Sequence, residues 1–282
     1  MTLAADECAG GRSLPVILLH GGGQTRHSWA GTLDALAAAG FYVVSLDLRG
    51  HGDSGWATDG AYGLDAHLSD LRAVIDELGG RAVVVGASLG GLTGLLAAGE
   101  DDDERVAALV MVDVVPAIEL EGAKEIRAFM TARPDGFGSV EEAAEVVAAY
   151  LPHRPRPSSA DGLMKNLRQR PDGRLHWHWD PAMFGAPTSG VVTAFRERAE
   201  AAARRVEVPT LLVRGGMSRV VSGAGVRAFL DLVTHAEYVN VADAGHMVAG
   251  DRNDAFTRPL LAFLTRVIAR IGNESSSAPN KD

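Results

Sequence analysis

Short apolar runs alternate with longer segments of helical periodicity along most of the chain. The runs are rich in Val, Ile and Leu and nearly continuous, which is typical of strands that helices cover on both faces. They are VILLH (16–20), YVVSLD (42–47), AVVVGA (82–87), VAALVMVD (106–113), TLLVRG (210–215) and AEYVNVA (236–242). Residues 28–40 and 64–80 repeat apolar residues at helical spacing and end at glycines. Because a helical segment follows each of the first three runs, the pattern predicts a doubly wound, mostly parallel α/β sheet.

The pattern changes between Asp113 and Val208. Amphipathic helical patterns occupy residues 141–151 and 191–205, and no strand run as clear as the others occurs before residue 210. A long stretch of this kind between two sheet strands favours an inserted helical cap over a loop. We therefore expect an α/β core at 1–113 and 207–272 and a helical cap at 114–206. The polar tail NESSSAPNKD (273–282) is expected to be disordered.

Composition narrows the class of partner. A net charge of −9 and a pI near 5.5 argue against nucleic acid and anionic membranes, since both need a basic surface. The single cysteine, Cys8, excludes an internal disulfide and favours a reducing compartment. No apolar run is long enough to span a bilayer, and residues 1–13 lack the pattern of a secretion signal. We expect a cytoplasmic protein that acts on a small molecule, with its oligomeric state left open.

The strongest chemical signal is GASLG (86–90), which follows a predicted strand and begins a helical segment of small residues. In a G-x-S-x-G turn, the serine lies at a sharp strand-to-helix corner whose strained backbone exposes the hydroxyl. Glycines are needed at 86 and 90 because side chains there would collide where strand and helix nearly touch. Ser88 is therefore the candidate nucleophile, at a helix N-terminus that favours developing negative charge.

Two further motifs follow predicted strands. LLHGGGQ (18–24) offers backbone N–H groups suited to one half of an oxyanion hole, with the N–H of Leu89 as the other half. Its glycines would equally suit a plain flexible turn. AGHM (244–247) supplies His246, and histidine is the side chain that takes a proton from a serine hydroxyl near neutral pH. With GASLG present, we favour the catalytic interpretation of both motifs.

HWHWD (176–180) alternates histidine and tryptophan, so an extended segment would present His176 and His178 on one face and Trp177 and Trp179 on the other. A metal site would need a third protein ligand beside the two histidines, and only Asp180 is adjacent. We favour a cap segment whose tryptophans line a substrate pocket. Neither a metal nor a cofactor is expected.

Together, LLHGGGQ, SLDLRGHGDS (45–54), GASLG, PTLLVRG (209–215) and DAGHMV (243–248) resemble the α/β-hydrolase superfamily. The resemblance is to the capped subgroup that includes esterases, C–C bond hydrolases and cofactor-free perhydrolases. It implies Ser88 as nucleophile, His246 as general base, and the N–H groups of Gly22 and Leu89 as oxyanion donors. Members with aspartate at the elbow use a carboxylate nucleophile, so the serine here favours acyl transfer. The family's N-terminal hairpin is expected to lack its outer strand or to carry a short one, because the first apolar run begins at residue 16.

The acid of the triad is missing from its usual place. In this superfamily it commonly follows the strand that corresponds to TLLVRG, but RGGMSRVV (214–221) has Arg219 there. A guanidinium beside His246 would oppose protonation of the imidazole. Asp113 is the substitute, because some members of the superfamily place their acid after the preceding strand; a structural role at the start of the cap stays equally open. Asp243 is too close to His246 in sequence to be well aimed at it.

The leading hypothesis is a serine hydrolase that cleaves a small or medium ester, or a related acyl compound such as a β-diketone. Ser88 would attack, His246 would move the proton and Asp113 would orient the imidazole. Arg219 motivates the alternative of a degenerate enzyme or ligand-binding protein that keeps the pocket. A third possibility is non-hydrolytic, cofactor-free chemistry on the same fold, such as perhydrolysis or a lyase or cyclase step.

Overall fold

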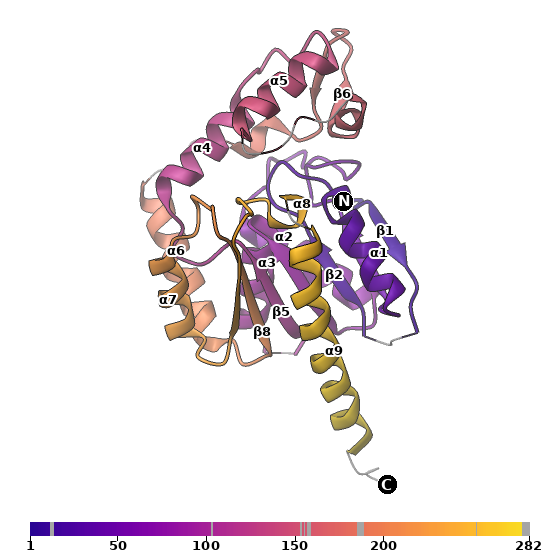
Figure 1. The fold of residues 1–282 in the computed structure, drawn as a ribbon, viewed down its shortest axis with the longest axis vertical. Coiled ribbons are helices and arrows are strands. Elements are labelled where there is room, and N and C mark those ends of the chain that lie inside the picture. The colour runs from indigo at the N-terminus through magenta and orange to yellow at the C-terminus, as the bar shows by residue number, and fades with distance from the viewer. Residues whose placement is uncertain are drawn as a thin grey trace.

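A seven-stranded sheet lies at the centre of the part of the chain that the computed structural model describes (Figure 1). That part comprises residues 1–11, 14–102, 104–152, 154, 156, 159–184, 189–251 and 253–277. The strands of the sheet are β1 (Ala5–Cys8), β2 (Val16–Leu19), β3 (Val43–Leu46), β4 (Ala82–Ala87), β5 (Val106–Val112), β8 (Thr210–Gly215) and β9 (Glu237–Val241). Their order is β1-β3-β2-β4-β5-β8-β9. Because β1 alone is antiparallel to its neighbour, the doubly wound, mostly parallel sheet is confirmed.

The winding of the sheet reverses at β2. β3 pairs with one edge of β2 and β4 pairs with the other, so successive crossovers run in opposite directions. In open α/β sheets, such a reversal opens a crevice beyond the carboxyl ends of the strands. The segment after β2 carries HGGGQ and the segment after β4 carries GASLG. The topology therefore brings both motifs to the same crevice.

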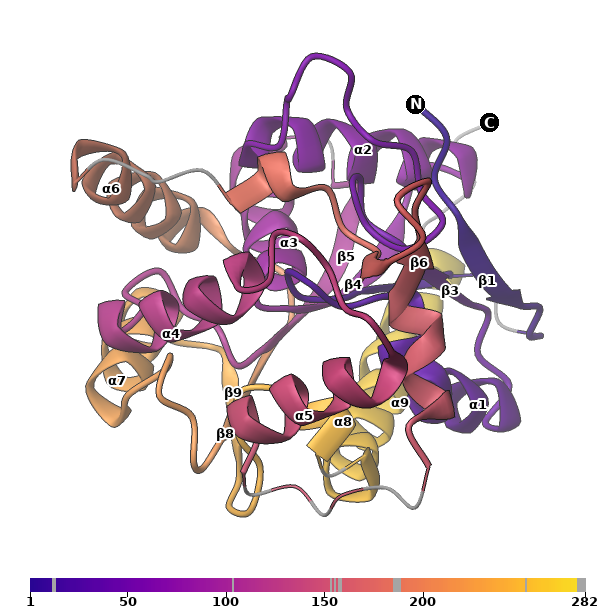
Figure 2. The same cartoon turned by 90° about the horizontal axis from the view of Figure 1, so that it is seen from above.

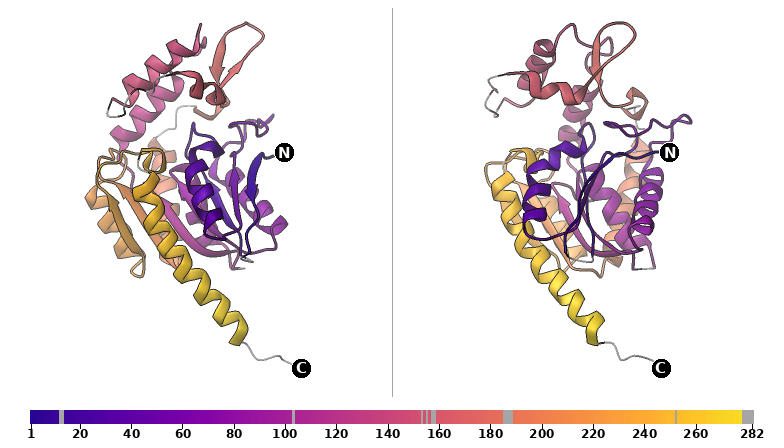
Figure 3. Two further views of the ribbon diagram at one scale, coloured as in Figure 1. Left: turned by 45° about the vertical axis from the view of Figure 1, so that its right-hand side comes forward. Right: turned by 90° about the vertical axis from the view of Figure 1, so that its right-hand side faces the viewer.

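Helices lie against both faces of the sheet (Figure 3), and successive residues of a strand such as β2 face different helical layers. Ile17 and Leu19 belong to one hydrophobic cluster, whereas Val16 and Leu18 belong to the other. The first cluster is covered by α2 (Leu64–Glu77), α3 (Leu89–Glu100), α6 (Ser189–Arg205) and α7 (Gly223–Leu232). The second is covered by α1 (Ala30–Ala38) and α9 (Asn253–Ser277), with η1 (Arg26–Trp29) and α8 (Val248–Asp251) beside them. Burial on both faces is why the strands read as nearly continuous apolar runs.

The segment between β5 and α6 forms a cap over the carboxyl ends of the strands (Figures 1 and 2). It consists of α4 (Leu120–Thr131), α5 (Val140–Tyr150), η2 (Asp161–Asn166), the hairpin β6 (Leu167–Gln169) and β7 (Leu175–Trp177), and η3 (Pro181–Phe184). The cap has a small core of its own, built from Met130, Phe137, Ala143, Leu167, Trp177 and Trp179. The hairpin strands are too short to produce a periodic signal in the sequence.

Helix α6 packs on the sheet, although the expected division assigns residues 114–206 to the cap. Ala199, Ala202 and Ala203 are buried in the cluster that faces the sheet. Gly99 of α3 lies so close to α6 that a Cβ atom there would be 2.1 Å from the Ala202 carbonyl oxygen. Because small residues allow this close approach, α6 completes the helical layer over the sheet. The cap, in the structural sense, ends before α6.

The two terminal segments are short extensions of the core. β1 is a four-residue edge strand whose residues alternate between exposed and half-buried, in keeping with the short outer strand that we expect. Residues 273–277, expected to be disordered, continue α9, whereas 278–282 lie outside the described residues. Among the described helices, none combines the length and the apolar character needed to cross a bilayer.

Candidate active site

The turn between β4 and α3 holds Ser88 in a left-handed backbone conformation, with φ 47° and ψ −113°. Its N–H donates to the carbonyl oxygen of Val112, on the neighbouring strand, at 3.1 Å. A Cβ atom at Gly86 would lie 2.3 Å from the carbonyl carbon of Gly90, and one at Gly90 would lie 2.5 Å from the carbonyl oxygen of Leu19. Side chains are therefore excluded at both glycines. This strained, close-packed corner has the features of a nucleophile elbow.

Asp113 follows β5, and its carboxylate is fully buried. Its Oδ2 atom lies 2.7 Å from Nδ1 of His246, and its Oδ1 atom accepts the backbone N–H of Gly215 at 2.9 Å. The hydroxyl of Ser218 donates to Oδ2 as well. Because the carboxylate acts as the acceptor, His246 carries its proton on Nδ1 and leaves Nε2 free to accept one. The structure thus places the predicted base in contact with Asp113. From the sequence alone, a structural role at the start of the cap is equally open for this residue.

The segment RGGMSRVV, which lacks the expected acid, holds Asp113 in place. Gly215 and Ser218 both belong to it and both donate to the carboxylate. The Ser218 hydroxyl is itself held, because it accepts the N–H groups of Val220 and Val221 at 3.1 and 3.2 Å. The loop where the resemblance places the acid therefore supplies, in this chain, hydrogen bonds that hold the carboxylate of the neighbouring strand.

Arg219 points away from this site. Its Nη1 atom lies 2.8 Å from a carboxylate oxygen of Glu125 on α4, and its side chain is 70% exposed. A guanidinium that is paired and solvated in this way has little influence on a distant imidazole. The structure therefore does not place the Arg219 guanidinium where it would oppose protonation of His246.

Ser88 and His246 line one cavity of about 310 Å³ between the sheet and the cap. The cavity is floored by the two predicted oxyanion residues, Gly22 and Leu89, together with the rest of the glycine loop. Core residues such as Ser28, Tyr62 and His67 line it as well. A mainly apolar part of the wall comes from the cap and from α8: Ile126, Phe129, Met130, Tyr150, Met183, Phe184, Val248 and Ala249. A site of this kind suits a small, largely apolar molecule whose reacting group lies beside Ser88.

The tryptophans of HWHWD lie behind this cavity, which differs from the expectation that they line it. Trp177 and Trp179 are buried and stacked, with ring centroids 4.9 Å apart. They line a separate cavity of about 180 Å³, which shares Met130 and Phe184 with the first. Phe129 stands in front of Trp177, with ring centroids 5.7 Å apart. The tryptophans therefore support the pocket wall as part of the cap core, and residues that no motif marked form its surface.

Two buried polar side chains in the cavity wall make no hydrogen bond within the described part of the chain. They are His67, through both ring nitrogens, and Trp29, through Nε1. Burial lowers the pKa of His67 to about 4, so its ring is neutral near pH 7. The carbonyl of Tyr62 lies near that ring and favours protonation, but no hydrogen bond of normal geometry results. Neither residue belongs to a motif, so nothing in the sequence marks it as part of the site.

The backbone of the glycine loop is oriented by histidine side chains. Nδ1 of His20 lies 2.7 Å from the carbonyl oxygen of Gly21, and Gln24 donates its N–H to the same oxygen at 3.1 Å. Because a peptide's C=O and N–H point in opposite directions, the Gly22 N–H is turned away from His20. A Cβ atom at Gly21 would lie 3.2 Å from Cβ of Ser88, so the loop lies against the elbow. Gly22 lines the same cavity as Ser88 and stays a candidate oxyanion donor.

The Gly23 N–H is excluded from that role. It donates to Nε2 of His51, in the RGHGDS turn, at 2.9 Å. Of the adjacent loop N–H groups, the one at Gly23 is therefore already used, as is the one at Gln24. Gly22, with Leu89 at the start of α3, therefore remains the candidate pair that the resemblance implies.

Comparison with known proteins identifies the family of the chain. "Esterase Rv0045c" of Mycobacterium tuberculosis (strain ATCC 25618 / H37Rv) is 32% identical over 255 residues, which are 86% of this chain and 80% of that protein. "2-(Acetamidomethylene)succinate hydrolase" of Mesorhizobium japonicum (strain LMG 29417 / CECT 9101 / MAFF 303099) is 31% identical over 212 residues, 74% of this chain and 73% of that protein. A crystal structure of E-2-(acetamidomethylene)succinate hydrolase superposes with a TM-score of 0.79 at 25% identity, covering 93% of this chain and 95% of that one. The alpha/beta hydrolase fold family matches residues 15–252. With its sheet, cap and elbow, this chain therefore belongs to the alpha/beta hydrolase fold family.

Proposed function

We propose that the protein is a serine hydrolase that cleaves a small or medium ester, or a related acyl compound, through an acyl-enzyme. The observation that carries the proposal is the hydrogen bond of 2.7 Å between Asp113 and His246, in one cavity with the elbow serine. A serine hydroxyl is a weak nucleophile until a correctly oriented base takes its proton. The buried carboxylate supports that orientation by holding the proton of His246 on Nδ1.

The reaction follows from these positions. Nε2 of His246 takes the hydroxyl proton as Oγ of Ser88 forms a bond to the substrate's carbonyl carbon. The carbonyl oxygen becomes an oxyanion, which accepts the N–H groups of Gly22 and Leu89. The proton on Nε2 then passes to the leaving group as its bond to carbon breaks, which leaves an ester on Ser88. In the second half, Nε2 takes a proton from a water molecule as the water oxygen forms a bond to the acyl carbon. The bond between that carbon and Oγ of Ser88 then breaks, Oγ receives the proton from Nε2, and the acid leaves.

The cavity supports a substrate of limited size with an apolar body. Its volume of about 310 Å³ lies at the lower end of small-molecule sites. Among the described residues, the ring nitrogens of His67 and Trp29 are buried in its wall without a hydrogen-bond partner, so we expect the substrate to bring at least one group that forms a hydrogen bond there. The two relatives bear the names of an esterase and of a hydrolase of a small acid, which supports cleavage of a small molecule.

The degenerate-enzyme alternative loses its motivation. It rested on Arg219 as a replacement for the acid, but that side chain pairs with Glu125 at the surface. Asp113 provides a buried carboxylate for His246 instead. Within the described residues, no feature favours non-hydrolytic chemistry over hydrolysis, so hydrolysis is the function that we propose.

The experiment is covalent labelling of Ser88 with a fluorophosphonate, followed by intact-mass measurement, together with hydrolysis of a series of p-nitrophenyl esters from acetate to octanoate. We expect stoichiometric labelling that Ser88→Ala abolishes, and the fastest hydrolysis with the shorter esters. A folded wild-type protein that neither takes the label nor hydrolyses any ester would refute the proposal.

A further inference from the structure

Three buried histidines form a row that links the core of the molecule to the cap. His20 and His51 have ring centroids 4.9 Å apart, and His51 and His178 have centroids 5.9 Å apart. His20 follows β2, His51 belongs to the RGHGDS turn, and His178 follows β7 in the cap. All three side chains are at most 1% exposed. The row passes along the glycine loop, so its hydrogen bonds determine how that loop is held.

The hydrogen bonds of His51 assign its tautomer. The Gly23 N–H is a donor, so Nε2 of His51 must accept. The proton of the neutral ring is then on Nδ1, which lies 3.0 Å from the carbonyl oxygen of Arg49 and donates to it. His51 thus connects the N–H side of Gly23 to a turn of the core.

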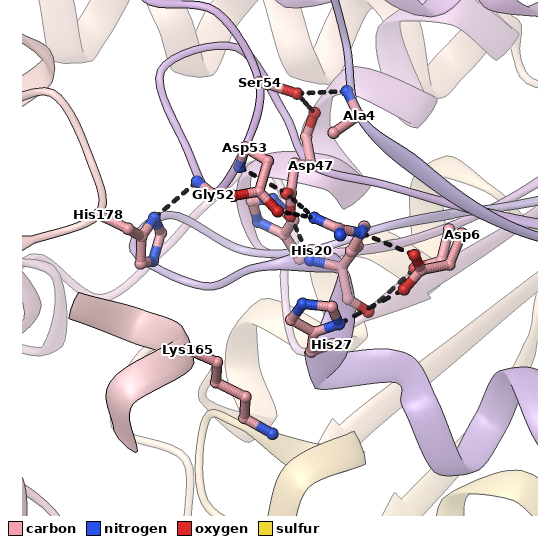
Figure 4. Close-up of polar contacts among 12 residues, drawn as sticks. Ala4, Asp6, His20, His27, Asp47, Gly52, Asp53, Ser54, Lys165 and His178 are labelled. Carbon is pink, nitrogen blue, oxygen red and sulfur yellow. Dashed lines mark hydrogen bonds and ion pairs between the residues drawn. The ribbon is translucent and has the colours of Figure 1, made fainter. Parts of the chain in front are cut away.

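His178 is assigned in the same way. The Gly52 N–H donates to its Nδ1 at 2.7 Å, so the proton of the neutral ring is on Nε2 (Figure 4). Nε2 lies 3.4 Å from the carbonyl oxygen of Gly23, a long contact in which it is the donor. Burial lowers the pKa of His178 to about 3, which keeps the ring in this neutral form.

Gly23 is therefore held from both sides, on its N–H by the core and on its carbonyl by the cap. Its φ of 75° is in the left-handed region, so the peptide units on either side of it are sharply turned relative to each other. The preceding residue, Gly22, supplies the proposed oxyanion N–H. A rotation at Gly23 would move that neighbour, and oxyanion donors act only when they are closely placed.

We propose that His178 is a positioning residue through which the seated cap fixes Gly23 and thereby the direction of the Gly22 N–H in the oxyanion hole. The inference rests on the proposed function of Ser88. It assigns to a cap residue an effect on the rate of the chemical step, beyond the effect on substrate fit that is expected of a cap.

The anchor of His178 is firm. The turn that contains Gly52 is organised around the buried carboxylate of Asp47, which accepts the N–H of Asp53 at 2.9 Å (Figure 4). The same carboxylate pairs with the guanidinium of Arg26. A Cβ atom at Gly52 would lie 2.1 Å from that carboxylate, so the turn has no space to shift toward it. Movement of the His178 ring is therefore limited at Nδ1, and Nε2 is left at a defined place beside Gly23.

The cap has other attachments to the core that do not pass through His178. Asp180 donates its N–H to the Gly50 carbonyl oxygen at 2.9 Å and accepts the hydroxyl of Tyr62. Arg168 forms an ion pair of 2.6 Å with Asp53. Substitution of His178 should thus leave the cap in place, whereas substitution of Arg168 weakens the attachment without touching Gly23. The two changes separate positioning of the loop from attachment of the cap.

The test compares His178→Asn, His178→Gln and Arg168→Ala with the wild type. Asparagine keeps an acceptor at the place of Nδ1 for the Gly52 N–H but has no donor that reaches Gly23. Glutamine places an N–H donor near the position of Nε2. The readouts are kcat and KM for a p-nitrophenyl ester, and the affinity for a trifluoromethyl ketone that forms a tetrahedral adduct with serine.

We expect H178N to lower kcat about tenfold with KM nearly unchanged, less than the loss of a complete oxyanion donor. The affinity for the ketone should fall by a similar factor, and H178Q should recover part of both. R168A should leave kcat unchanged.

Wild-type kcat and ketone affinity in H178N would overturn the inference, as would an equal loss of kcat in R168A. Loss of thermal stability in H178N without loss of kcat would assign a purely structural role to the ring. A wild-type protein that is not labelled at Ser88 would overturn the proposed function and this inference together, whereas labelling and turnover that are insensitive to His178 would overturn the inference alone.

Discussion

Replacing Asp113 by asparagine tests the assignment of the acid, and the contacts of the carboxylate indicate how the amide would lie. Oδ1 accepts the N–H of Gly215, which an amide oxygen can also accept. The amide nitrogen then takes the place of Oδ2, opposite Nδ1 of His246 and the Ser218 hydroxyl. Because that nitrogen donates, Nδ1 must become the acceptor and Nε2 must carry the proton. In this tautomer, His246 cannot take a proton from Ser88.

We expect Asp113→Asn to lower kcat about 10⁴-fold, the loss that the wrong tautomer causes in serine hydrolases. This corresponds to about 5 kcal/mol of transition-state stabilisation. The assay is the initial rate of p-nitrophenyl ester hydrolysis, normalised to the concentration of folded protein. Asparagine tolerates the left-handed backbone of Asp113, where φ is 50°, so the melting temperature should change little.

Arg219→Ala is the matched control, because Arg219 occupies the usual position of the acid. Its exposed ion pair with Glu125 contributes little to stability, so activity should stay within about twofold of the wild type. The reasoning is refuted if D113N keeps more than about a tenth of the wild-type rate, since loss of a triad acid lowers kcat far more than tenfold. It is equally refuted if R219A loses as much activity as D113N.

Low pH and the substitution Gly86→Ala should each lower the stability of the fold. Burial lowers the pKa of His20 and His178 to about 3 and that of His67 to about 4, against about 6.5 in the unfolded chain. Below pH ~6.5 the unfolded state therefore binds protons that the folded state does not, so stability is complete above this pH and falls as the pH decreases toward 3. At pH 5 each of these histidines should lower the free energy of unfolding by about 2 kcal/mol, measured by urea titration at pH 7 and pH 5; equal stability at both would contradict neutral burial. Gly86→Ala should open the elbow, because the added Cβ atom would lie 2.3 Å from the Gly90 carbonyl carbon. We expect the free energy of unfolding to fall by about 1–3 kcal/mol and fluorophosphonate labelling of Ser88 to be lost. An unchanged melting curve with full labelling would show that the elbow has space for a methyl group.

The sheet was predictable because its strands are buried on both faces. Each of the six apolar runs became a strand whose bounds differ by at most a residue or two from the run, since such burial leaves little choice of residue type. β1, with the sequence ADEC, has no such signal because it is an edge strand with half of its residues exposed. α6 shows the limit of helical periodicity, which predicts an apolar face but not whether that face packs on the cap or on the sheet.

The site was predictable where a local motif requires special backbone geometry, and not where it depends on distant contacts. Ser88 lies in the turn that G-x-S-x-G predicts. The choice of Asp113 depends on a contact with His246 across 133 positions of sequence, and on Ser218 taking the inward position that lets Arg219 point outward. Aromatic composition marked Trp177 as important, but it could not distinguish a pocket wall from the packing behind it.

Ser88 and Asp113 have φ values of 47° and 50°, in a region that non-glycine residues occupy at a cost in conformational energy. These are two of the three residues whose side chains the proposed chemistry needs, and the third is His246. At Ser88, folding stability and activity make opposite demands, because glycine would relax the backbone and remove the nucleophile. At Asp113 they agree, because glycine would also leave the buried Gly215 N–H and the Ser218 hydroxyl without their acceptor. Selection for stability alone would therefore remove the serine and keep the aspartate, so a serine at this strained position persists only where turnover is also selected.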